Sequence, residues 1–319
     1  IMLMKSYLKE VGSSLYDEAD TMEFVDLCRS MNIVNNLPEY TKPKNVGLMF
    51  FSMEPERFFP YAQIDVVEFP DDTGDRIREK TFKGPLHQQL REALLYIKNS
   101  VLQEQIIKRD DVAEARRFFN YPYAAIEEAL SNAVYHKGYD EREPIEVRVE
   151  TDRIIIVSHP GADRSISAQG LKEFRVYNRR YRNRRIGEFL KEMHLTEGRN
   201  TGFRKIRNAL LNNGSPEPLF ETDEDRTYFA TTLYIHPDFG KHQNDGVING
   251  VINGAINLKP NEERIIECVK KNPNITVKEL AELLEVGTST IDRAIKTLKQ
   301  KGILTRQGSN KKKEWVLLR

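Results

Sequence analysis

The sequence predicts a mixed α+β protein built from a body, a linker and a small basic tail. Strand-like and helix-like apolar patterns alternate through residues 44–239, as expected for an α+β body. A stretch rich in asparagine and glycine follows at residues 240–258. From Lys259 onward, 14 Lys and Arg residues stand against 8 Asp and Glu, whereas the whole chain of 319 residues has a net charge of only +1. We therefore expect residues 259–319 to form a separate domain that attracts a polyanion.

The composition excludes two broad classes. Hydrophobic residues make up 39% and charged residues 30%, which is typical of a globular protein rather than a disordered one. No run reaches the ~18 apolar residues that a membrane span needs, so no membrane partner is expected. Cys28 and Cys268 have no Cys or His neighbour at metal-ligand spacing, which predicts no zinc site and favours a cytoplasmic location.

The N-terminal part of the chain is the least informative. Ile1 is not an initiator methionine, which is consistent with a fragment. Residues 1–43 hold amphipathic pieces but no motif that predicts a function. The apolar runs Asn45–Phe51 and Ala62–Phe69 predict two strands, with a turn over Ser52–Pro60.

Strands and helices alternate along the rest of the body. Ile145–Glu150 alternates apolar and polar residues, and Arg153–Val157 is an apolar run, so the two predict strands joined by a tight turn. Thr227–Ile235 predicts a further strand. Helical patterns cover Leu86–Gln105, Pro122–Tyr135, Arg185–Met193 and Gly202–Asn213, the last of them closed by Gly214 at a C-cap.

A linker is predicted at Asn244–Asn257, within residues 240–258. This segment repeats VING, VING and AIN, and its closely spaced glycines and asparagines favour neither helix nor strand. Asp245 is its only acid, which argues against a metal-binding repeat.

The tail predicts three helices followed by a hairpin. Asn261–Lys270 is a first amphipathic helix, and Val277–Glu285 is a second. Thr276 and Glu279 have the spacing of a capping box at the start of the second helix. A third helix is predicted over Ser289–Lys301, with Thr288 as its N-cap.

The third helix of the tail divides into two faces. Ile291, Ile295 and Leu298 recur at helical spacing and should pack inward. The opposite face carries hydroxyls and cations, which suit base edges and phosphates. These predicted DNA-binding residues are Thr288, Ser289, Thr290, Arg293 and Lys296.

Two further strands, Ile303–Arg306 and Glu314–Leu318, should flank a wing. Lys311, Lys312 and Lys313 are predicted at its tip, where they suit contact with phosphate. The whole tail resembles the winged helix–turn–helix domains of bacterial regulators, which implies binding of double-stranded DNA. Palindromic operators would favour a homodimer. The alternative is a winged helix that contacts protein.

One helix of the body carries a candidate site. In AAIEEALSNAVYHKGY (residues 124–139), Glu128, Asn132 and His136 are spaced by four and share one face. The arrangement E-x-x-x-N resembles the first motif of the GHKL ATPases. That resemblance implies that Glu128 polarises the attacking water and that Asn132 holds Mg²⁺. The alternative is an ordinary amphipathic helix with its polar residues outward.

Two later segments extend the resemblance over residues 44–237. They are Ser158-His159-Pro160-Gly161 and Glu197–Phe203, whose glycines would let backbone N–H groups approach phosphate. Their order resembles a divergent GHKL-like branch, an α/β sandwich labelled "RecG-like helicase C-terminal", found downstream of a Schlafen-type AlbA domain; residues 1–43 would be the remnant of that domain. The implied cofactor-binding residues are Asn132, His136, His159, Gly161, Gly198, Thr201 and Gly202. No G-x-x-x-x-G-K-[ST] loop is present, so the sequence does not support a helicase.

The chain departs from GHKL enzymes at a key position. His159 stands where those enzymes place an aspartate that accepts the adenine amino group. The resemblance makes ATP with Mg²⁺ a candidate ligand. Because of this departure, we expect no efficient hydrolysis. The basic segment Lys172–Arg185, with seven cations and one acid, suits either a triphosphate or nucleic acid.

These observations predict a DNA-binding transcriptional regulator with a nucleotide- or effector-sensing body. One alternative is a DNA-associated ATP hydrolase that uses Glu128. Another is a protein-interaction module in which the pocket binds nothing.

Overall fold

The computed structural model describes residues 1–35, 37, 40–71, 76–107, 115–176, 180–196, 201–240 and 248–250, and in the tail residues 264–266, 268–269, 272, 275–284, 286–300, 304–309 and 312–317. The chain divides into two compact units, Ile1–Asn253 and Gly254–Arg319. Each unit has its own hydrophobic core. The mixed α+β fold class is confirmed.

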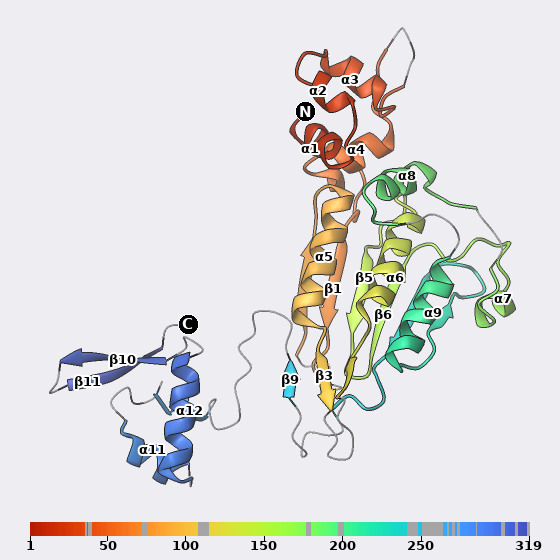
Figure 1. Ribbon diagram of the computed structural model, residues 1–319. Coiled ribbons are helices and arrows are strands. Elements are labelled where there is room, and N and C mark those ends of the chain that lie inside the picture. The colour runs from red at the N-terminus through yellow and green to blue at the C-terminus, as the bar shows by residue number, and fades with distance from the viewer. Residues whose placement is uncertain are drawn as a thin grey trace. The chain divides into compact units, whose positions relative to one another are not determined.

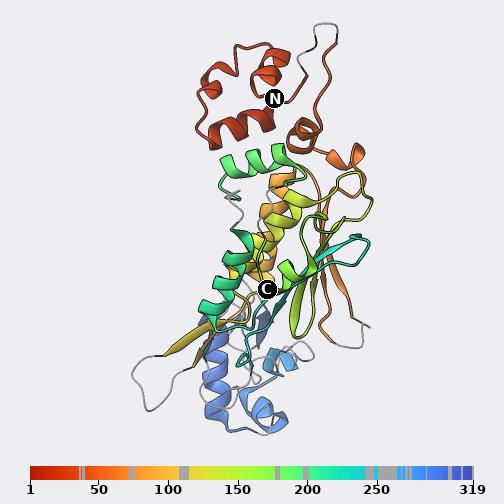
Figure 2. The ribbon, with the colours of Figure 1, turned by 90° about the vertical axis from the view of Figure 1, so that its right-hand side faces the viewer.

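The body consists of a sheet covered by helices. Six strands have the order β2-β1-β5-β6-β8-β7; β1 and β5 are parallel, and the other neighbours are antiparallel. Three long helices pack on the sheet, and two views at right angles show helices and sheet as two layers (Figures 1 and 2). The strands are β1 (Ile64–Glu68), β2 (Arg78–Phe82), β5 (Ile145–Val149), β6 (Arg153–Ser158), β7 (Leu219–Glu221) and β8 (Phe229–Tyr234), and the helices are α5 (Leu86–Ser100), α6 (Tyr123–His136) and α9 (Gly202–Asn213).

Small side chains let α6 pack closely within this layer. Ala125, Ala129 and Ala133 follow one another at intervals of four and are all buried. On the sheet, Ile154 and Ile156 of β6 are buried, while Arg153, Ile155 and Val157 are only partly covered. Burial therefore alternates along β6, as the geometry of a strand requires, although the sequence of this strand is a continuous apolar run.

Residues 1–43 form helices that join the core of the body. They are α1 (Met2–Glu10), α2 (Leu15–Glu18) and α3 (Phe24–Ser30). Met4, Leu8 and Leu27 are buried in the same cluster as the sheet and helices. The ring of Tyr7 packs at 5.1 Å from that of Phe189, which lies on α8 (Arg184–Glu192). The origin of this region in an AlbA-like domain stays a prediction.

The strand predicted at Asn45–Phe51 is wrong, because these residues form helix α4. Val46, Met49 and Phe50 are buried at helical spacing, so the apolar run serves a helix that packs on one side. Gly47 faces the chain before it, and a Cβ there would lie 2.8 Å from the carbonyl oxygen of Ile33. The predicted turn that follows contains the 3₁₀ helix η1 (Pro55–Arg57).

The helix predicted over Leu86–Gln105 is shorter in the structure than in the prediction. It stops at Ser100, and β3 (Glu104–Ile107) begins four residues later. The buried Asn120 fixes this change, since its side chain donates to the carbonyl of Val101 at 2.8 Å and accepts from the N–H of Gln103 at 2.8 Å. A residue far along the chain thus ends the helix, which local periodicity does not reveal.

Three residues of the predicted linker belong to a strand. β9 (Ile248–Gly250) pairs antiparallel with β3, which also pairs with β4 (Arg116–Phe119). The prediction that this whole segment lacks strand structure is therefore wrong at these residues. Backbone groups pair in a ladder whatever the side chains, so a weak strand propensity can be overridden. The rest of Asn244–Asn257 lies outside the described residues.

The tail is a small helical unit with a hairpin. Residues 264–266 and 268–269 are helical, and α11 (Val277–Leu283) and α12 (Thr288–Gln300) follow. The predicted capping box is confirmed, because the Thr276 side chain accepts from the N–H of Glu279 and the Glu279 side chain from the N–H of Thr276. Strands β10 (Leu304–Ser309) and β11 (Lys312–Leu317) pair to complete the unit. Among the described residues, no helix has the length and apolar character that crossing a membrane would require.

Candidate functional site

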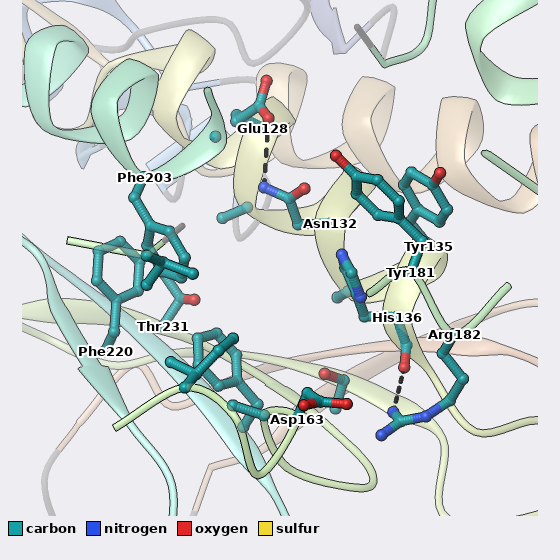
Figure 3. A pocket seen from close by; sticks show the side chains of 18 of the residues that line it. Glu128, Asn132, Tyr135, His136, Asp163, Tyr181, Arg182, Phe203, Phe220 and Thr231 are labelled. Atoms are coloured by element: carbon teal, nitrogen blue, oxygen red, sulfur yellow. Dashed lines mark hydrogen bonds between the residues drawn. The ribbon is translucent and has the colours of Figure 1, made fainter. Parts of the chain in front are cut away.

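A cavity of about 330 Å³ lies in the body between the sheet, α6 and α9 (Figure 3). Its floor comes from one face of three strands, since Ile156, Thr231 and Phe220 are direct partners across β6, β8 and β7. Phe203 of α9 meets the ring of Phe220 edge-on, with centroids 4.3 Å apart. A largely apolar pocket of this size with a few convergent polar groups is typical of a small-molecule site.

Glu128 and Asn132 stand together on the α6 side of this cavity. The Asn132 amide donates to Glu128 Oε1 at 3.3 Å (Figure 3). On the other carboxylate oxygen, Lys205 Nζ lies 3.6 Å from Glu128 Oε2. The Glu128 side chain is only 15% exposed, so this pair of contacts is partly shielded from water. The spacing of four in the sequence therefore does bring these two groups together.

The backbone of Gly202 lies close to this pair. A Cβ at this position would lie 2.6 Å from Asn132 Nδ2 and 2.8 Å from Glu128 Oε1. No side chain fits there without displacing one of the two polar groups. Thr201 and Gly202 line the cavity, whereas Gly198 lies outside the described residues.

The segment after β6 reaches the cavity through Gly161 and Asp163 rather than through His159. Ser158, Pro160, Gly161 and Asp163 line the cavity. His159 is not among the lining residues, and its Nδ1 lies 2.9 Å from the carbonyl oxygen of Thr227. A Cβ on Gly161 would lie 2.3 Å from Thr222 Oγ1, so glycine allows the strand end to pack against the chain before β8.

Asp163 is a cavity carboxylate that we did not assign from the sequence. Ser165 donates to Asp163 Oδ1 from its N–H at 2.9 Å and from its hydroxyl. These hydrogen bonds lower the pKa of Asp163, so the side chain stays charged at neutral pH. The motif HPGAD places this acid four residues after His159, and that spacing is the signal that the sequence offered.

Aromatic rings and arginines close another side of the cavity. Tyr135 and Tyr181 stack with their centroids 4.9 Å apart and an interplanar angle of 8°. Arg182 donates to the backbone carbonyl of His136 (Figure 3). Burial, with a smaller contribution from the Arg182 guanidinium, lowers the pKa of His136 to about 4. His136 is therefore neutral at pH 7 and can both donate and accept a hydrogen bond.

The basic segment Lys172–Arg185 supplies part of this wall. Val176, Arg180, Tyr181 and Arg182 line the cavity, and residues 177–179 lie outside the described part of the chain. Two arginines beside a cavity with a carboxylate–amide pair suit an anionic ligand with a bound cation.

Other residues that line the cavity were not predicted from the sequence, for a different reason. Phe220, Phe229 and Thr231 belong to strands that are far in sequence from α6. Alternation in FATTLY predicts that Phe229 and Thr231 share a face, but nothing in it predicts which helix covers that face.

The described part of the chain contains no group of three or more His, Cys, Asp or Glu side chains arranged to hold a metal. Magnesium needs fewer protein ligands, because it usually keeps water and binds one or two side-chain oxygens together with substrate phosphates. The side-chain oxygen of Asn132, whose amide nitrogen donates to Glu128, fits that requirement.

The tail presents a second candidate site on α12. Thr288, Ser289, Thr290, Arg293 and Lys296 are all exposed. On the opposite face, Ile291 and Leu298 are fully buried and Ile295 is 6% exposed. The two-faced helix predicted from the sequence is confirmed, although Thr288 is the first helical residue rather than the residue before it.

The hairpin after α12 differs from the predicted wing. Ser309 pairs with Lys312 and Gly308 with Lys313, so these two lysines lie in β11 and not in a loop tip. The prediction that these two lysines lie at the tip of the wing is wrong, because the backbone pairing between β10 and β11 includes them. Lys311 lies outside the described residues. Trp315 of β11 anchors the hairpin, since its Nε1–H donates to the carbonyl of Ile275 at 2.8 Å.

Comparison with known proteins agrees with this division. Residues 143–233 match the family model described as "Putative ATP-dependent DNA helicase recG C-terminal", and residues 261–309 match an HTH domain. The first match contains β5, β6 and β8 with Gly161 and Gly202, while α6 precedes it. A search of curated proteins gives no match.

A similar solved structure is that of the DIP2311 protein from Corynebacterium diphtheriae. It is 18% identical, with a TM-score of 0.53, and the alignment covers 98% of this chain and 60% of that one. At this identity the likeness concerns the fold alone, and the chain spans about three fifths of the length of that solved chain. Residues 143–233 are thus similar to the RecG C-terminal family model, and residues 261–309 are similar to an HTH domain, a type of domain that binds DNA.

Proposed function

We propose that this chain is a transcriptional regulator that binds double-stranded DNA through α12 and holds a nucleoside triphosphate with Mg²⁺ in the body cavity. The observation that carries the DNA part is the exposed face of α12. It offers hydroxyls and two cations, Arg293 and Lys296, while its isoleucines and leucine form the core of the tail. Such a face suits base edges and phosphates of a major groove.

The nucleotide part rests on the composition of the cavity. Asn132 would hold Mg²⁺, and Arg180 and Arg182 would meet phosphate oxygens. Asp163 would accept a hydrogen bond from the amino group of a base. Thr201 and Gly202 would bring the start of α9 close to phosphate, where backbone N–H groups and the helix dipole favour negative charge.

Glu128 favours a sensor over an efficient hydrolase. One of its oxygens faces Lys205 Nζ at 3.6 Å, and the other accepts from Asn132. A general base needs an oxygen directed at the attacking water. Both oxygens of Glu128 already have protein partners, so slow hydrolysis is the expected behaviour.

Nucleotide occupancy would act on DNA binding through a homodimer. Operators with two half-sites require two copies of α12 at a fixed spacing. A ligand that prefers one conformation of the body shifts the population of dimers with that spacing.

A thermal-shift assay tests the nucleotide part. ATP with Mg²⁺ at 100 times its dissociation constant should stabilise the folded body by about 2.7 kcal/mol. Gly202→Ala should remove this shift, because the new Cβ displaces Asn132 or Glu128. Gly287→Ala is the matched control, since a Cβ there meets nothing closer than 3.8 Å. No shift with millimolar ATP in the unmodified protein would refute the nucleotide part.

Glu128→Gln separates a regulator from an enzyme. The variant should keep sequence-specific DNA binding, measured on duplexes selected from a random pool. A hydrolase that needs the tail only for docking would instead lose its turnover with this single change.

A further inference from the structure

A second, open groove of about 980 Å³ lies in the body, apart from the helix–turn–helix unit. Its walls come from the start of α4, the segment after η1, the loop after α6 and the first turn of α8. These segments are far apart in sequence, so the groove is a product of the fold rather than of one motif.

The described lining of this groove is strongly basic. Its cations are Lys44, Arg142, Arg182, Arg184 and Arg185, and Asp140 is its one acid. Arg142 and Arg184 are exposed and have no ion-pair partner among the described residues. Arg185 is paired with Glu188. The lining therefore has a surplus of positive charge.

An aromatic ring stands beside these cations. Phe58 lines the groove and is 54% exposed, while its neighbour Phe59 packs against the core. A flat apolar group can stack on a ring that is more than half exposed in a groove lined by arginines.

We propose that this groove binds single-stranded nucleic acid. The cations would follow the phosphates, and Phe58 would stack on a base. Stacking requires a base whose face is open, which a duplex does not offer away from its ends. This feature favours a single strand over the double-stranded DNA expected at α12, and over a run of Asp and Glu, whose side chains have no rings to stack.

The test measures binding of a labelled single-stranded thymidine oligonucleotide of about 16 nucleotides to the full chain by fluorescence anisotropy. The double variant Arg142→Ala/Arg184→Ala should weaken binding at least tenfold. It should also lower the slope of log affinity against log salt by about 1.4, at roughly 0.7 for each cation removed. Phe58→Ala should weaken binding about tenfold with an unchanged slope, since it removes stacking but no charge.

Matched controls lie outside the groove. Lys191→Ala removes an exposed cation from the same helix, α8, and Leu95→Ala removes an exposed apolar side chain from α5. Both should bind the oligonucleotide like the unmodified protein. Melting temperatures are compared for all variants. Arg142→Lys keeps the positive charge, so it should bind the oligonucleotide like the unmodified protein if the charge alone is needed at this position.

Three results would overturn the proposal. The first is an affinity for the oligonucleotide that changes less than twofold both in Arg142→Ala/Arg184→Ala and in Phe58→Ala. The second is loss of single-strand binding in Arg293→Ala, which would place that binding on the tail. The third is equal competition by polyglutamate of the same charge, which would mean that the groove attracts any polyanion.

Discussion

The tail helix α12 and the body cavity use similar residue types but are assembled in different ways. On α12, all the candidate residues lie within three turns of one helix, and the buried stripe of Ile291 and Leu298 fixes which face is exposed. In the cavity, Glu128, Asp163 and Gly202 come from separate segments that only the packing of α6, α9 and the sheet brings together. The first arrangement depends on local periodicity, whereas the second depends on tertiary packing.

This difference has an energetic side. The tail core and the body core share no residue. A change that destabilises one unit should therefore leave the stability of the other unit unchanged. The DNA-binding face should therefore survive damage to the cavity, and the cavity should survive damage to the tail.

The largest expected effect tests that independence. Ile291→Ala should destabilise the tail by about 3 kcal/mol, because the fully buried side chain leaves a cavity in a small core. Leu90→Ala on α5 removes an equally buried side chain from the body and is the matched variant. Calorimetry should show only the tail transition moving in the first and only the body transition in the second. A shift of both transitions in either variant would break the comparison.

A pH effect of similar size should appear in the body alone. Burial, with a smaller contribution from Arg91, lowers the pKa of His87 to about 4, below its ordinary value of 6.5. As pH falls below 6.5, the unfolded chain takes up a proton that the folded chain refuses until about pH 4. His87 alone should therefore cost the body up to about 3 kcal/mol of stability across this window and nothing above pH 6.5. His136, whose pKa is lowered to about the same value, should add a loss of its own in the same window.

His87→Phe should remove the part of this loss that His87 causes and leave the part that His136 causes, because the residue stacks on Phe50 and a phenyl ring has no proton to gain. Denaturant unfolding at pH 7 and pH 4.5 provides the measurement. The tail has no histidine from Lys259 onward, so its transition should show no such loss in this window. If the loss of stability between pH 7 and pH 4.5 is unchanged in His87→Phe, groups other than His87 cause it.

The specificity of DNA binding should respond to Arg293. Arg293→Ala should cost about 2 kcal/mol on the preferred duplex and relax the choice of base at one position. Lys278→Ala on α11 is a control that removes an exposed cation from the same unit. Binding titrations on preferred and altered duplexes give the result. Equal loss on both duplexes would make Arg293 a phosphate contact.

The smallest effect concerns the start of α11. Thr276→Ala removes the side chain that accepts from the N–H of Glu279 and should destabilise the tail by about 1 kcal/mol. Thr276→Ser keeps the hydroxyl and should retain most of this stability. Chemical denaturation of both variants compares them, and equal loss would show that the methyl group rather than the cap matters.

The sequence predicted the elements that depend on local pattern. The bounds of α9 and the positive φ of Gly214 at its C-cap agree with the prediction, as do the capping box and the two faces of α12. Glycine and capping signals act within a few residues, so neighbouring letters are sufficient to recognise them. Glu128 and Asn132 were found for the same reason.

Elements that depend on partners elsewhere in the chain were missed or misassigned. The helix α4 was predicted as a strand because an apolar run of seven residues suits either structure. β2 (Arg78–Phe82) carries exposed charged residues, and only its pairing with β1 makes it a strand. Asp163 and Thr231 belong to the cavity because of sheet order, which periodicity does not contain.

The contact between α6 and α8 connects the cavity of the body with its basic groove. A Cβ on Gly187 of α8 would lie 1.9 Å from Cζ of Tyr135, so the backbone of α8 packs directly against this ring of α6. Tyr135 faces the cavity, and the same helix α8 brings Arg184 and Arg185 to the groove. We therefore expect that single-stranded nucleic acid in the groove, if it displaces α8, would also move Tyr135 and so alter the shape of the cavity.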